Sequence, residues 1–108
     1  MRKVRVAAAM VEDIPPDLGK VVALGDDGSQ CALFLNEGTW YAVGSLCPHQ
    51  NSSLEGAPAC AGVVTCQRHG YRFDLKTGDC LTVGGYGLPV FTVSVENDIV
   101  FVNYWEYD

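Results

Sequence analysis

The chain has 108 residues, enough for one domain with a core of its own but too few for a catalytic domain beside it. Hydrophobic residues make up 48% of the chain, with twelve glycines and five prolines, which indicates a compact, turn-rich protein rather than a disordered one. The formal net charge of −6 argues against non-specific binding to nucleic acid. No apolar run approaches the length of a membrane-spanning helix, and residues 6–11 are too few for the apolar part of a signal peptide.

The predicted elements are short strands separated by turns. Alternating or β-branched apolar residues predict strands over 3–8, 20–24, 31–35, 39–43, 62–65, 71–74, 89–95 and 99–103. Residues 11–17 predict a turn or a single helical turn, which the double proline Pro15-Pro16 ends. No segment shows ten residues of helical periodicity. The expected fold is all-β: a small antiparallel β-sandwich or partly open barrel.

Two pairs of metal-binding residues stand out between these strands. Cys47-Pro48-His49 is followed, after sixteen residues, by Cys66-Gln67-Arg68-His69, and these pairs contain the only two histidines of the chain. Two thiolates and two imidazoles suit either a tetrahedral zinc ion or a two-iron cluster. Zinc fingers usually pair Cys with Cys and His with His, so the mixed pairs favour the cluster. A thioredoxin-type redox pair is excluded, because Gln50 stands three residues after Cys47.

The pattern Cys-x-His, sixteen residues, Cys-x-x-His resembles the Rieske [2Fe–2S] domain family. The run His69-Gly70-Tyr71-Arg72-Phe73-Asp74-Leu75-Lys76-Thr77-Gly78-Asp79-Cys80-Leu81 also resembles the stretch after the second histidine in Rieske ferredoxins. The resemblance implies one Rieske domain over 1–108, with ligand loops at about 45–53 and 64–72 inserted as a cluster-binding subdomain. It implies one [2Fe–2S] cluster held by Cys47, His49, Cys66 and His69.

Charge counting explains what this ligand set would do. Two ferric ions, two sulfides and two thiolates sum to zero, whereas a four-thiolate cluster carries −2, so the mixed cluster takes up an electron more easily. The iron held by His49 and His69 is expected to accept that electron. In Rieske proteins of respiratory complexes, an extra Cys stands where this chain has Ser52 and Arg68, and a Ser where it has Tyr71. With fewer donors to the sulfurs, the potential is expected at the low end of the Rieske range.

The other three cysteines are Cys31, Cys60 and Cys80. Cys31 lies in an apolar run and is expected in the core, while Cys60 and Cys80 are expected to be free thiols, although a bridge between them stays open. Free thiols fit a reducing cytoplasm, so a cytoplasmic location without a membrane anchor is expected.

The resemblance implies that the chain is an electron carrier. An enzymatic role is not expected, because the sequence shows no nucleophile with a base, no open metal triad and no nucleotide-binding fingerprint. Its partners would be a flavin-containing reductase and a terminal, aromatic-ring or related oxygenase, and the carrier would be a monomer. One alternative is the small Rieske subunit of an assimilatory nitrite reductase. A second is a zinc-stabilised interaction module.

Three surface features carry two interpretations each. The cations within and after the second ligand pair are Arg68, Arg72 and Lys76. They either face a docking partner or, for the last two, pair with Asp74 or Asp79. The loop over 84–89 either covers the cluster or is a simple connection. The aromatic tail over 104–108 either docks a partner or folds back on the sheet, and the second is expected.

Overall fold

The structure, a computed structural model, describes residues 2–25, 28–48, 51–68 and 70–106. Its regular structure is almost entirely β-strand, with one 3-10 turn over Val11–Asp13 at the place where a turn was predicted. The strands are β1 (Arg2–Met10), β2 (Lys20–Ala23), β3 (Gln30–Asn36), β4 (Thr39–Gly44), β5 (Leu46–Cys47), β6 (Ser52–Ser53), β7 (Ala59–Cys60), β8 (Val63–Thr65), β9 (Arg72–Asp74), β10 (Val90–Glu96) and β11 (Ile99–Glu106). The described part of the chain contains no helix with the length and hydropathy that a membrane crossing requires.

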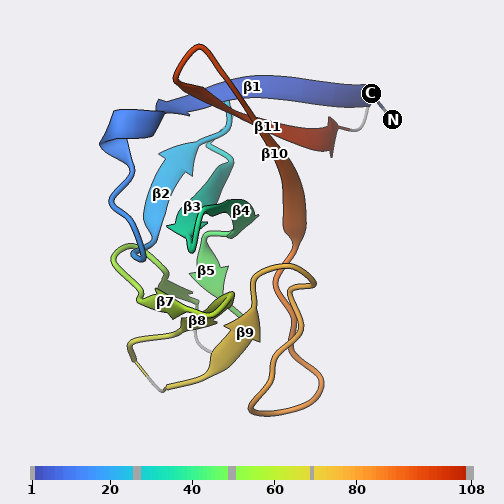
Figure 1. Ribbon diagram of the computed structural model, residues 1–108. Helices are drawn as coiled ribbons and strands as arrows, with labels where there is room; N and C mark the ends of the chain where they lie inside the picture. The colour runs from blue at the N-terminus through green and yellow to red at the C-terminus, as the bar shows by residue number, and fades with distance from the viewer. Residues whose placement is uncertain (1, 26–27, 49–50, 69, 107–108) are drawn as a thin grey trace.

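Six of these strands form one curled antiparallel sheet in the order β1-β11-β10-β4-β3-β2. In Figure 1, β1 and β11 pass across the top of the molecule, and β2, β3 and β4 lie beneath them. The expected partly open barrel is therefore confirmed. β11 is longer than predicted and pairs with β1 as far as Arg2 and Glu106. Residues 104–106 therefore continue the sheet as part of β11, whereas the tail was expected to fold back on it. Tyr107 and Asp108 lie outside the described residues.

The core has two parts that meet at β3. The apolar run of β3 points alternately to the two faces of the sheet, because successive side chains of a strand lie on opposite sides. Cys31 and Leu33 belong to the buried cluster inside the curled sheet, whereas Ala32 and Phe34 belong to a second buried cluster beneath it. All four are fully buried. The second cluster is shared with the segment that carries the predicted ligands.

That segment, residues 45–89, is inserted between two paired strands of the main sheet. β4 and β10 are neighbours, with Val43 opposite Val90, although the whole insertion separates them in the sequence. It contains the hairpin β5–β6 and the three-stranded sheet β7-β8-β9, which lie below β3 and β4 in Figure 1. The expected ligand-bearing subdomain is thus present. The two-residue strands β5, β6 and β7 were not predicted, because two residues show no periodicity.

Candidate metal centre

The first predicted ligand ends β5, at the start of a tight hairpin. Cys47 pairs with Ser52 and Leu46 pairs with Ser53, and Asn51 closes the turn by donating its N–H to the carbonyl of Cys47 at 2.7 Å. Alternation sends the Leu46 side chain outward, where it is 46% exposed, and the Cys47 side chain inward, where it is 1% exposed. The hairpin therefore presents the Cys47 thiol to the interior.

The second predicted ligand follows β8 in a similar turn. The N–H of Cys66 donates to the carbonyl of Tyr71 at 2.7 Å, and the carbonyl of Cys66 accepts from the N–H of Gly70 at 2.9 Å. Cys66 is also 1% exposed. The backbone around each cysteine is thus held by short hydrogen bonds, so both thiols occupy fixed, buried positions.

The structure brings the two cysteines into one buried cluster, the one shared with β3, together with Phe34, Phe73 and Leu88. His49 and His69 lie outside the described residues, so their part in the ligand set stays a prediction. All members of the buried cluster are apolar apart from the thiols, and an ionised thiolate in such surroundings needs a positive charge close by. A soft metal ion supplies that charge, so the two cysteines fit a zinc or iron centre.

The remaining cysteines are not members of this buried cluster, although Cys80 packs against it. Cys31 lies in the cluster inside the curled sheet, and burial raises the pKa of its thiol to about 12. Cys60 is exposed and Cys80 half-buried, and both are free. Ala59 pairs with Val64, Val64 pairs with Phe73, and Phe73 pairs with Cys80. Strands β8 and β9 therefore lie between Cys60 and Cys80, which explains why no disulfide forms between these two cysteines.

A buried amide that the sequence did not single out ties the insertion to the main sheet. Asn36, the last residue of β3, is 3% exposed. Its Nδ2 donates to Asp17 Oδ1 at 2.8 Å and to the carbonyl of Ala59 at 3.2 Å, and its Oδ1 accepts from the N–H of Gly62 at 2.8 Å. In the sequence, Asn36 stands before Glu37-Gly38 between two predicted strands, a pattern that indicates only a turn.

Two further contacts hold the ligand loops. Gly19 approaches the end of the first loop so closely that a Cβ there would lie 2.3 Å from the carbonyl oxygen of Leu54, which only glycine permits. Gln67, inside the second ligand pair, donates from Nε2 to the carbonyl of Gly56 at 3.1 Å. A hydrogen bond therefore connects the second loop to the segment after the first, without a disulfide.

The cations near the second loop face solvent. Arg68, Arg72 and Lys76 are exposed, and within the described residues none of the three forms an ion pair. Asp74 instead accepts the backbone N–H groups of Lys76 and Thr77 at 2.8 and 3.2 Å, as in an Asx turn. The predicted pairing of Arg72 or Lys76 with Asp74 or Asp79 is therefore wrong, because the carboxylate of Asp74 is used by the turn.

The loop over 84–89 contacts the second ligand loop. The ring of Tyr86 packs edge-on against Tyr71, with 6.0 Å between the ring centres. Leu88, which is 5% exposed, enters the same buried cluster as Cys47 and Cys66. The loop is thus more than a connection, since Leu88 anchors it in the buried cluster that contains both cysteines.

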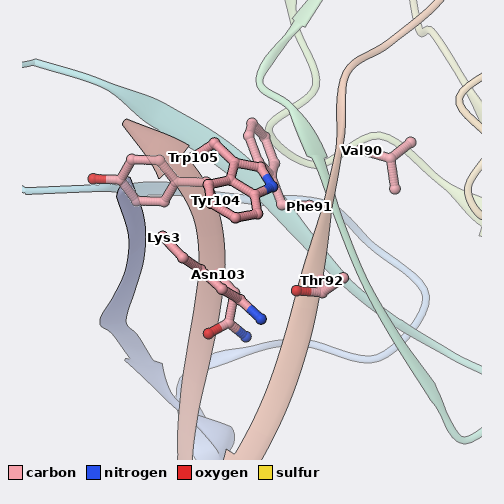
Figure 2. A pocket seen from close by; sticks show the side chains of 7 residues that line it. All are labelled: Lys3, Val90, Phe91, Thr92, Asn103, Tyr104 and Trp105. Carbon is pink, nitrogen blue, oxygen red and sulfur yellow. The ribbon is translucent and has the colours of Figure 1, made fainter. Parts of the chain in front are cut away.

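A separate groove lies over β1, β10 and β11. Figure 2 shows the rings of Phe91, Tyr104 and Trp105 gathered in it, with Lys3 and Asn103 nearby. Neither Cys47 nor Cys66 lines this groove, and its described lining offers a single charged group. It therefore belongs to the main sheet and not to the metal centre.

Comparison with known proteins agrees with this geometry. The family model described as the Rieske [2Fe-2S] domain matches residues 4–91. The ferredoxin component of the naphthalene 1,2-dioxygenase/salicylate 5-hydroxylase systems of a Ralstonia species is 32% identical over 93 residues, which are 85% of this chain and 88% of that protein. The 3-phenylpropionate/cinnamic acid dioxygenase ferredoxin subunit of Shigella boydii is 33% identical over 101 residues, 92% of each chain.

Among solved structures, a putative NADH-dependent nitrite reductase small subunit from Mycobacterium tuberculosis superposes with a TM-score of 0.82 at 26% identity, over 99% of this chain and all of the other. The predicted cysteine pair is buried in one place, and the family match spans both ligand loops. This chain belongs to the Rieske [2Fe-2S] domain family and carries the cluster that defines it.

Proposed function

We propose that this chain is a cytoplasmic, monomeric ferredoxin of one domain that passes single electrons from a flavin-containing reductase to a terminal oxygenase. The ligands would be Cys47, His49, Cys66 and His69. The observation that carries the proposal is the burial of Cys47 and Cys66 in one apolar cluster at the end of an inserted subdomain. The two relatives named as ferredoxin components of dioxygenase systems support the choice of partner.

When bound, the [2Fe–2S] cluster supplies reversible one-electron exchange. The protein's own contribution begins with Cys47 and Cys66, whose thiolates would hold one iron in a site closed to water. Leu54, Phe73 and Leu88 belong to the same buried cluster, and their apolar side chains keep the local dielectric low. His49 and His69 would hold the other iron.

The position of the insertion suits rapid exchange with a partner. The insertion lies at the opposite end of the molecule from β1 and β11 in Figure 1, so it forms an end that a second protein can approach. The exposed Arg68 and Arg72 next to the second loop add local positive charge to an acidic protein. A partner with a patch of carboxylates would complement this end.

The central test is purification without oxygen, followed by measurement of metal and acid-labile sulfide. We expect a red-brown protein with two iron and two sulfide per chain. The reduced protein should pass its electron to an aromatic-ring oxygenase, and an oxidised sample should be reduced by a flavin reductase. A colourless protein with one bound zinc ion would overturn the proposal and restore the zinc-stabilised module.

A second candidate function is that of a nitrite reductase small subunit. It is favoured by the likeness to the Mycobacterium tuberculosis structure, which covers the whole chain. The two functions separate in an assembly experiment. A ferredoxin should exchange electrons with its partner during brief encounters, whereas a reductase subunit should co-elute with a large catalytic subunit on gel filtration.

A further inference from the structure

Ser52 is the residue directly opposite Cys47 in the hairpin β5–β6. Directly opposed residues of an antiparallel pair place their side chains on the same face, with Cβ atoms about 4.5–5.5 Å apart. The neighbouring pair, Leu46 and Ser53, is exposed on the other face. The Ser52 side chain therefore lies on the inner face, beside the Cys47 thiol.

The hydroxyl of Ser52 is buried and unsatisfied. Its Oγ has no hydrogen-bond partner in the part of the chain that the structure describes, and no other buried side-chain nitrogen or oxygen there shares this state. Buried hydroxyl groups nearly always find a partner, so an exception calls for an explanation. By contrast, the hydroxyl of Ser53 is used, because it accepts the N–H of Glu55 at 3.1 Å.

We propose that Ser52 donates its O–H to the Cys47 sulfur when the cluster is bound, and so raises the reduction potential. A thiolate bound to iron is a hydrogen-bond acceptor, and the hydroxyl proton can rotate toward it. Reduction adds negative charge to the cluster and its sulfurs, so a donor at this sulfur stabilises the reduced state more than the oxidised state. Ser52 thus tunes the cluster without being one of its ligands.

This inference rests on the proposed ligand role of Cys47. It also changes how Ser52 is interpreted. In the sequence, Ser52 stands where respiratory Rieske proteins have an extra cysteine, and this difference predicted weaker stabilisation of the reduced cluster. Under this proposal, the Ser52 hydroxyl would partly replace that support once the cluster is bound.

The test compares the midpoint potentials of wild type, S52A and S53A by protein-film voltammetry, after each protein is shown to hold two iron and two sulfide. We expect S52A to lower the equilibrium constant for reduction about tenfold, which is about 59 mV for one electron. S53A, which removes the hydroxyl on the outer face of the same hairpin, should leave the potential unchanged. Resonance Raman bands of the iron–thiolate stretch should shift in S52A and not in S53A.

An S52A potential equal to that of wild type, or an equal shift in S53A, would overturn the role of Ser52 and leave the cluster ligands intact. If S52A does not retain the cluster, the potentials of S52T and S52V are compared instead. Threonine and valine have the same shape, and only threonine carries a hydroxyl group. A higher potential in S52T supports the proposal, and equal potentials refute it. A wild-type protein without a cluster would instead refute the proposed function.

Discussion

Replacement of Asn36 by alanine tests how firmly the metal-binding insertion is fixed to the sheet. The change removes three hydrogen bonds, to Asp17, Ala59 and Gly62. The carboxylate of Asp17 is on the surface and can turn to water, but the carbonyl of Ala59 and the N–H of Gly62 lose a buried partner. Each such backbone group costs about 1–3 kcal/mol, so the free energy of unfolding should fall by about 2–6 kcal/mol.

For a chain of this length, 1 kcal/mol corresponds to about 4–8 °C in Tm, so N36A should melt at least about 8 °C, and at most about 48 °C, below wild type. Circular dichroism would follow the sheet, and visible absorbance would follow the cluster, which should be released faster. Asn103→Ala is the matched control, because Asn103 lies on β11 and no side-chain hydrogen bond is found for it in the described residues. A Tm of N36A within about 2 °C of that control would refute the reasoning.

Four other predictions concern the cluster, its partner and the sheet. Cys47→Ser and Cys66→Ser should each abolish the visible spectrum and destabilise both ligand loops, since metal binding and folding are coupled in such sites; iron analysis and calorimetry measure this. The midpoint potential should lie near the low end of the Rieske range, about −150 mV, and a clearly positive value by voltammetry would contradict it. Arg68→Gln should slow association with an acidic partner and weaken its salt dependence in stopped-flow experiments, whereas a changed potential would assign Arg68 to the cluster instead. Burial raises the pKa of the Cys31 thiol from 9.0 to about 12, so the unfolded chain loses this proton at lower pH than the folded chain. The free energy of unfolding should therefore fall as the pH rises from about 9 to 12, by at most about 1.4 kcal/mol per pH unit. Denaturant titrations should show a weaker pH dependence in Cys31→Val.

Most of the main sheet was predictable, because each of its strands has a pattern of its own. β3 is a continuous apolar run, as expected for a strand buried on both faces, and β10 and β11 alternate around a short turn. Their ends lie within three residues of the predicted ones, and most of the differences are extensions, because pairing with a neighbour extends a strand past its apolar residues. β11 is the largest case, because β1 is long enough to pair with it up to Glu106.

The insertion was less predictable, since its shape depends on contacts distant in the sequence. The spacing of cysteines and histidines predicted where the metal should bind, and the structure places Cys47 and Cys66 in one buried cluster. No local pattern revealed the roles of Asn36 and Gly19, which act on residues about 20 to 35 positions away. Ser52 was visible only as a departure from a family pattern, and its significance comes from its register with Cys47.

The junction between β4 and β10 has a consequence for how this protein can be re-engineered. The two ends of the insertion meet, because the N–H of Gly44 donates to the carbonyl of Pro89 at 2.9 Å. A short turn could therefore join the two strands, and other inserted modules could be grafted at the same junction without changing the strand order. A six-stranded sheet without the insertion would need polar residues in place of Ala32, Phe34 and Val43, because removal of the insertion would expose these three side chains to solvent.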